Sequence, residues 1–174
     1  MAATVQQAGT GVLNPVGDSP SPALSTSTVQ LDPNGSQALS ATVNASGLAP
    51  GGYQGYLQVT GAATSNVTTI PYWFAVPGST PAGITVLYQD YYDPIRTVSY
   101  GAVVFRIVDI AGLPYSGPLT PRIAMTAGGG SIRNAYRAGD IPGTYGVDIR
   151  AGTTTMQLNI SIAGMTQAVI IGVN

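Results

Sequence analysis

The sequence contains no cysteine, no histidine, no lysine and no glutamate. Without these side chains the chain cannot build a Ser-His-Asp or Cys-His site, a Ser-Lys site or a Schiff base. Zinc sites normally depend on Cys or His ligands, and both are missing. Because there are no disulfides, any folded domain must hold together by packing alone. We therefore expect a chain that is not an enzyme and has no cofactor, with calcium as the one open possibility.

Charge is also scarce. Charged residues make up 7% of the 174 residues, and the net charge is −1, whereas about 25% is typical of globular proteins. The six arginines are scattered, so neither nucleic acid nor a polybasic membrane contact is expected. No apolar run is long enough to span a bilayer. A polar surface of Ser, Thr, Asn, Gln and Gly is typical of a secreted or cell-surface protein, and we expect any signal peptide to lie upstream.

What the sequence does contain is alternation with a period of two. Ile70, Tyr72 and Phe74 share one face of a predicted strand, and residues 156–162 alternate apolar and polar throughout. Turn-forming segments rich in Gly, Pro and Asp separate such stretches. The pattern predicts an all-β chain of two tandem immunoglobulin/fibronectin III-like β-sandwiches.

The distribution of strand signals divides the chain. Residues 1–22 show little strand signal and are predicted to be a tail and linker, and residues 23–77 are predicted to form the first sandwich. Residues 78–83 are a Gly/Pro-rich run predicted to be a partly stiff linker. Residues 84–174 are predicted to form the second sandwich.

A Pro-Gly-x-Tyr motif occurs once in each block and ends at Tyr53 and at Tyr145. A Pro-Gly pair closes a tight turn because Pro presets φ and Gly accepts positive φ. A Tyr at the start of the following strand is typical of the tyrosine corner of β-sandwiches, where its hydroxyl bonds to nearby backbone. We predict structural roles, not binding roles, for both tyrosines.

The segment 89–94 brings two carboxylates close together in sequence, Asp90 and Asp93. Hard oxygen ligands of this kind suit calcium. The alternative is a solvated loop in which the aspartates cap turns.

Aromatic residues are dense around this segment. Tyr88, Tyr91, Tyr92 and Tyr100 are candidates for a surface that stacks on a sugar or a peptide, and the alternative is core or inter-domain packing. Trp73 is predicted to pack at a sheet edge or against the neighbouring domain.

The second block contains the segments 103–109, 112–114, 127–132 and 138–145. In these segments it resembles an invasin-type bacterial immunoglobulin-like domain. Domains of that family are spacers or adhesive modules of secreted and surface proteins, which the resemblance implies for this block.

The first block is similar to the fibronectin type III-like domain that follows the catalytic domain in many subtilisin-like proteases, on residues 47–56 and 70–76. Residues 6–14 resemble the end of such a catalytic domain. The resemblance implies an upstream subtilisin-like catalytic domain as partner, and it carries over no catalytic residue.

The leading hypothesis is a non-catalytic accessory region of a secreted bacterial subtilisin-like serine protease that stabilises, spaces or positions the catalytic domain. The alternative is an extracellular adhesion module that binds a protein or a glycan. A third interpretation is a β-module that associates with itself, because low charge weakens repulsion between exposed strand edges.

Overall fold

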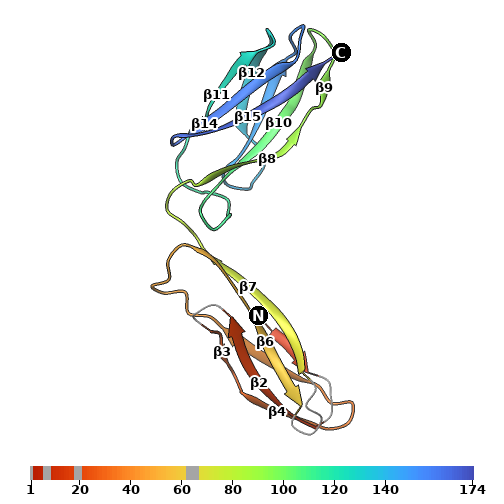
Figure 1. Ribbon diagram of the computed structural model, residues 1–174, viewed down its shortest axis with the longest axis vertical. Coiled ribbons are helices and arrows are strands. Elements are labelled where there is room, and N and C mark those ends of the chain that lie inside the picture. Colours follow the sequence, from red (N-terminus) through yellow and green to blue (C-terminus); the bar gives the residue numbers. More distant parts are fainter. Residues whose placement is uncertain (1, 6–8, 18–20, 62–66) are drawn as a thin grey trace. The chain divides into compact units, whose positions relative to one another are not determined.

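The computed structural model describes residues 2–5, 9–17, 21–61 and 67–174. The chain divides into two compact units, Met1–Val76 and Pro77–Asn174. Every regular element in the described ranges is a β-strand (Figure 1). The predicted all-β fold is therefore confirmed.

Unit 1 is a sandwich of two antiparallel sheets. One sheet has the order β1-β5-β3 and the other the order β4-β2-β6-β7. The strands are β1 (Ala2–Val5), β2 (Gly9–Gly17), β3 (Ala23–Leu24), β4 (Thr28–Leu31), β5 (Gln37–Thr42), β6 (Gly51–Gly61) and β7 (Val67–Val76).

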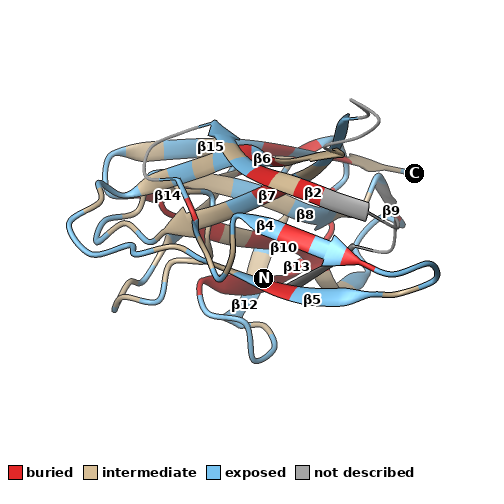
Figure 2. Cartoon of the chain, turned by 90° about the horizontal axis from the view of Figure 1, so that it is seen from below, coloured by how far each residue is buried: buried red, intermediate tan, exposed pale blue. Residues whose placement is uncertain are grey.

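The core of unit 1 is small and aliphatic, and it follows the alternation in the sequence. Along β4 buried and exposed residues alternate, as the red and blue bands in Figure 2 show. Every second side chain of a strand points to the same face, so β2, β4, β5 and β6 each contribute one or two residues to the space between the sheets. The buried set is Leu13, Val29, Leu31, Leu39 and Leu57.

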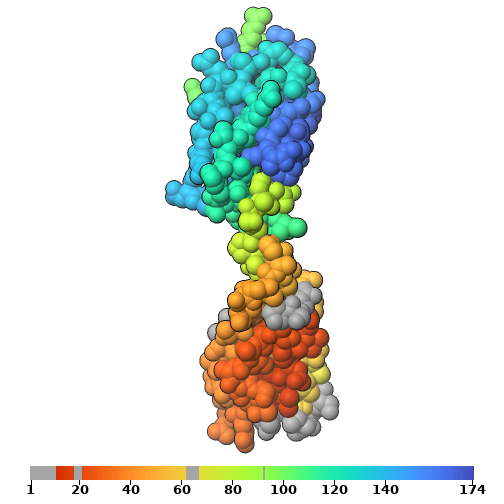
Figure 3. Space-filling view, turned by 90° about the vertical axis from the view of Figure 1, so that its left-hand side faces the viewer, coloured from red at the N-terminus to blue at the C-terminus, as the bar shows by residue number. Residues whose placement is uncertain are grey.

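The predicted tail of residues 1–22 is wrong for residues 9–17. They form β2, which pairs with β4 on one side and with β6 on the other, and Leu13 is only 1% exposed. Figure 3 shows the red surface that follows residue 10 among the orange of later strands in the body of this unit. The same strand contradicts the assignment of residues 6–14 to the end of a catalytic domain over its described part.

The sequence does not predict β2 as a strand because glycine weakens a strand signal. A Cβ on Gly17 would stand 2.4 Å from the Cα of Gly55. Both positions therefore need glycine so that β2 and β6 can approach. With β1 and β2 the first block reaches seven strands, the number that residues 23–77 alone do not supply.

Unit 2 is a second sandwich. Its sheets have the orders β12-β13-β10-β8 and β11-β14-β15-β9. The strands are β8 (Gly83–Gln89), β9 (Tyr92–Asp93), β10 (Val98–Val108), β11 (Arg122–Ala127), β12 (Ser131–Arg137), β13 (Thr144–Arg150), β14 (Met156–Ile162) and β15 (Met165–Val173).

The core of unit 2 is larger and closed on both sides by its sheets. Phe105 is fully buried and stacks on Tyr145 with 5.4 Å between ring centroids. Met156, Leu158 and Ile160 on β14 are all 0% exposed, as their alternation predicts. Each such aliphatic side chain contributes about 1.5–3 kcal/mol when it leaves water.

The predicted linker of residues 78–83 belongs to unit 2. The backbone N–H of Gly78 donates to Oδ2 of Asp109 over 2.6 Å, and the N–H of Ala82 donates to the carbonyl oxygen of Val108 over 2.8 Å. Asp109 is only 4% exposed, and its Oδ1 accepts the N–H groups of Ala111 and Leu113. One buried carboxylate thus ties the incoming chain to the turn after β10, which a Gly/Pro composition cannot reveal.

Candidate functional site

The predicted acidic pair lies where β8 ends and β10 begins. Asp90 accepts hydrogen bonds from the hydroxyl of Tyr88 over 2.6 Å and from the hydroxyl of Ser99 over 2.5 Å. Asp93 lies on the short strand β9, which pairs in parallel with the end of β15. The residues of the predicted calcium site are therefore on neighbouring segments of one end of unit 2.

Asp93 is the unusual member of the pair. Its side chain is 4% exposed, and its Oδ2 has no hydrogen-bond partner. Burial raises the pKa of the Asp93 carboxyl because it disfavours the charged form, and the negative charge of Asp90 raises this pKa further. The nearby hydroxyl of Ser99 opposes these effects in part. The site therefore favours either a proton on Asp93 or a compensating positive charge beside it.

A bulge in β10 places Ser99 against Asp90. The register of β10 on β13 shifts between Ser99 and Val103, and Gly101 in this stretch has φ 64, a value that glycine adopts without strain. The N–H of Gly101 donates to Oδ1 of Asp148 over 2.8 Å, and the N–H of Asp90 donates to the carbonyl oxygen of Ala102. Asp148 thus supports the bulge from the neighbouring strand.

Within the described ranges no group of three or more His, Cys, Asp or Glu side chains comes together. The two aspartates supply only part of the six to eight oxygens that calcium takes. Calcium at Asp90 and Asp93 therefore stays a prediction.

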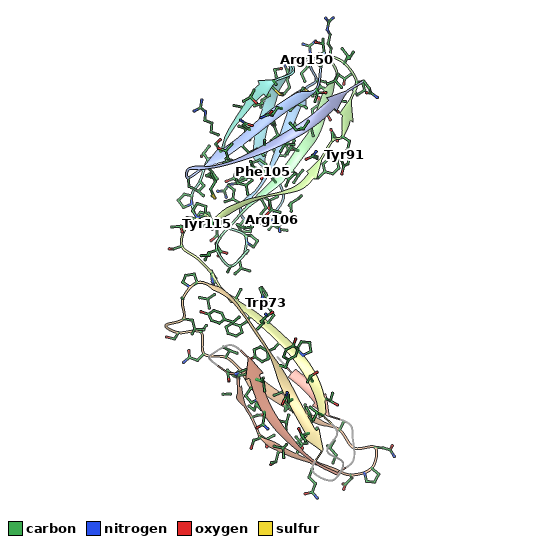
Figure 4. All side chains as sticks on the ribbon, viewed as in Figure 1. Trp73, Tyr91, Phe105, Arg106, Tyr115 and Arg150 are labelled. Carbon is green, nitrogen blue, oxygen red and sulfur yellow. The ribbon has the colours of Figure 1, made fainter. Side chains whose placement is uncertain are left out.

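The predicted tyrosine surface divides into different environments. Tyr91 is 78% exposed and Tyr100 is 82% exposed, and Figure 4 shows Tyr91 projecting outward beside unit 2. Tyr88 is exposed as well, and its hydroxyl bond to Asp90 raises its pKa. The side chain of Tyr92 lies outside the described residues.

The two corner tyrosines use their hydroxyls differently. The hydroxyl of Tyr53 donates to the carbonyl oxygen of Ala49, four residues earlier, over 2.8 Å, as the corner pattern predicts. The hydroxyl of Tyr145 donates to the carbonyl oxygen of Leu119 over 2.8 Å. It therefore holds the segment between β10 and β11, which is distant in sequence. The identical motifs therefore stabilise different backbone segments.

Sequence reasoning missed a pocket of about 370 Å³ at the end of unit 2. Arg96 and Arg150 line it together with Gly129, Gly130 and Ser131. Nε of Arg150 donates to the carbonyl oxygen of Arg96 over 3.3 Å, which brings the two arginines together. They are 54 residues apart in sequence, so no local motif could have indicated the pocket.

No helix long and apolar enough to cross a membrane occurs in the part of the chain that the structure describes. A scan against protein-family models and a search of the curated proteins both find no match.

Among solved structures, the chain is similar to domains 4 and 5 of the S-layer protein SbsC, with a TM-score of 0.46 and 13% identity over 94% of this chain and 70% of that chain. It is also similar to a structure of domains 4–9 of the surface layer protein SbsC, with a TM-score of 0.42 and 14% identity over 94% of this chain and 21% of the other. Similarity at this level assigns no function.

Proposed function

We propose that the chain is a non-catalytic pair of β-sandwich modules in a secreted or cell-surface protein, and that unit 2 acts as a spacer. The observation that carries this proposal is the path of the chain through unit 2. The incoming chain is bonded at Gly78 to Asp109, beside the end of β10. Asn174, directly after β15, exchanges backbone hydrogen bonds with Asp93 and Ile95, ahead of β10.

These two places are opposite ends of the same sandwich (Figure 1), because β10 runs the length of its sheet between them. A module that the chain enters at one end and leaves at the other adds its full length to a series of domains. A fold whose termini met at one end would not separate its neighbours in this way.

The polar groups of unit 2 support a structural role. Asp109 accepts three backbone N–H groups, and Asp148 accepts one. Such bonds satisfy loop backbone that would otherwise be left without a partner. The carboxylates are therefore used to hold loops in place.

The proposed parent is a secreted bacterial subtilisin-like serine protease whose catalytic domain lies upstream, as the sequence resemblance implies. The test has two arms. The complete reading frame should encode that catalytic domain, and the purified chain should show no peptidase activity on casein or on chromogenic peptide substrates. A reading frame without a protease would refute the parentage alone, whereas peptidase activity that survives purification would refute the non-catalytic role.

A further inference from the structure

The outer face of the four-stranded sheet of unit 1 carries two exposed aromatic rings. Successive side chains of a strand point to opposite faces, so the neighbours of the buried Leu57 and Tyr72 point away from the core. These neighbours are Tyr56, which is 53% exposed, and Trp73, which is 61% exposed. Large apolar rings grouped on an exposed face mark binding surfaces more often than chance exposure does.

The strand register places the two rings side by side. Tyr56 lies between Val16 on β2 and Pro71 on β7, and Trp73 lies opposite Gln54 in the next outward row. Tyr56 and Trp73 are therefore diagonal neighbours on adjacent strands, a separation of about 7–8 Å that aromatic side chains bridge. Val16 is itself 45% exposed, so the apolar surface extends across three strands.

A glycine makes room for the indole to lie along the sheet. The Nε1 atom of Trp73 is 3.4 Å from the place that a Cβ on Gly52 would occupy. Gly52 is on the same outward face of β6 as Gln54 and Tyr56, two and four residues along. The indole thus extends from β7 over the neighbouring strand and offers a ring surface to solvent, and Figure 4 shows Trp73 on this unit.

The ligand class follows from charge. The segment Met1–Val76 contains no Arg or Lys, and its only acidic residues are Asp18 and Asp32. The outward rows also carry amides and hydroxyls such as Asn14, Gln58 and Thr69, which pair across β2, β6 and β7. A polyanion or a polycation finds no ion-pair partners here, whereas a neutral, hydroxyl-rich chain finds hydrogen-bonding groups beside aromatic rings.

We propose that this aromatic face binds a neutral polysaccharide, with sugar rings stacked on Trp73 and Tyr56. One face of a pyranose ring presents C–H groups with partial positive charge, which are attracted to the negative face of an aromatic ring. The adjacent amides donate and accept hydrogen bonds with sugar hydroxyls. The proposal goes beyond the spacer role, which needs no ligand.

Trp73 is the only tryptophan in the chain, so its fluorescence reports directly on the proposed face. The full chain would be titrated with soluble neutral polysaccharides (xylan, mixed-linkage β-glucan, galactomannan and amylopectin) and with the acidic alginate and polygalacturonate. At least one neutral polymer should shift or quench the emission, and the apparent affinity should change little with salt because no ion pairs form.

Binding by variants is measured by affinity electrophoresis, in gels that contain the polysaccharide found to bind the wild type. Trp73→Ala and Tyr56→Ala should each weaken binding about tenfold or more, the loss of roughly 1.4 kcal/mol of contact energy. Ile141→Ala, at a 50% exposed apolar side chain of unit 2, is the control and should bind like the wild type. Hydrogen exchange of unit 1 checks that each variant is folded.

Three results would overturn the proposal: no binding to any neutral polymer, binding to the acidic polymers alone, or equal losses in Ile141→Ala and Trp73→Ala. None of these results bears on the upstream reading frame or on peptidase activity, so this proposal and the proposed function fail separately.

Discussion

The hydroxyl of Tyr145 lies 2.8 Å from the carbonyl oxygen of Leu119, 26 residues earlier, and donates a hydrogen bond to it. Leu119 is in the connection between β10 and β11, and these strands belong to different sheets. The ring of Tyr145 stacks on Phe105 in the core. One side chain therefore fixes a connection between sheets to the centre of unit 2.

Tyr145→Phe should destabilise unit 2 by about 1–2 kcal/mol, because it removes the donor and leaves the carbonyl of Leu119 unpaired in a partly buried place. Tyr53→Phe should cost unit 1 less, since the bond to Ala49 is exposed and water can replace it. Hydrogen exchange followed by mass spectrometry measures each unit in the intact chain. A larger loss in Tyr53→Phe than in Tyr145→Phe would contradict this ranking.

The contrast between these tyrosines shows how far sequence reasoning reaches. The Pro-Gly-x-Tyr motif predicts the bond of Tyr53 to Ala49, because that partner is four residues away. The partner of Tyr145 depends on where a distant connection crosses the sandwich. Local patterns fix turns and strand faces, and long-range partners follow only from the assembled fold.

The same distinction explains which elements could be predicted. The strands from β4 to β8 and from β10 to β15 lie where alternation or β-branched runs predict them. The sequence does not predict β2, because glycine indicates a loop, whereas Gly17 is required here by a close contact with β6. At the candidate site, the sequence shows that Asp90 and Asp93 are close together along the chain, whereas the burial of Asp93 depends on the pairing of β9 with the end of β15.

Asp109→Asn should loosen the chain at residues 77–83. The amide offers one acceptor oxygen where the carboxylate accepts from Gly78, Ala111 and Leu113, so at least one partly buried N–H loses its partner, at about 1–3 kcal/mol. We expect faster cleavage of this segment by proteinase K and a lower free energy of unfolding of unit 2.

Asp140→Asn is the matched control for Asp109→Asn, because Asp140 is exposed in the turn before β13. It removes the same charge and should leave cleavage unchanged. Equal protection of the segment in Asp109→Asn and the wild type would show that the carboxylate does not anchor the incoming chain.

Asp93 should make unit 2 more stable in mild acid than at neutral pH, measured with EDTA present. Its folded pKa is raised by burial and by Asp90, so the native state binds the proton more tightly than the unfolded state does. The stabilisation is therefore present below the ordinary Asp value of about 3.9 and is lost as the pH rises through the raised folded pKa. Urea unfolding between pH 3.5 and 7 measures it.

Asp93→Asn mimics the protonated carboxyl, so this variant should be at least as stable as the wild type at pH 7 and should lack the part of the pH dependence due to Asp93. Asp140→Asn should keep that part. A wild type that loses stability steadily on acidification through this range, with the same slope in Asp93→Asn, would contradict a raised pKa of Asp93.

A bound calcium ion would also compensate the buried charge of Asp93. In that case Asp93→Asn should lose a stabilising effect, whereas with a protonated Asp93 it should not. If Ca²⁺ binds at Asp90 and Asp93, millimolar CaCl₂ should raise the unfolding temperature of the wild type, because a ligand of the native state stabilises it by mass action. Mg²⁺ should act less, since it demands a stricter octahedral geometry. Asp93→Asn should abolish the calcium effect and Asp140→Asn should retain it. Identical melting curves in CaCl₂ and in EDTA would exclude the calcium site and leave the proton as the compensating charge.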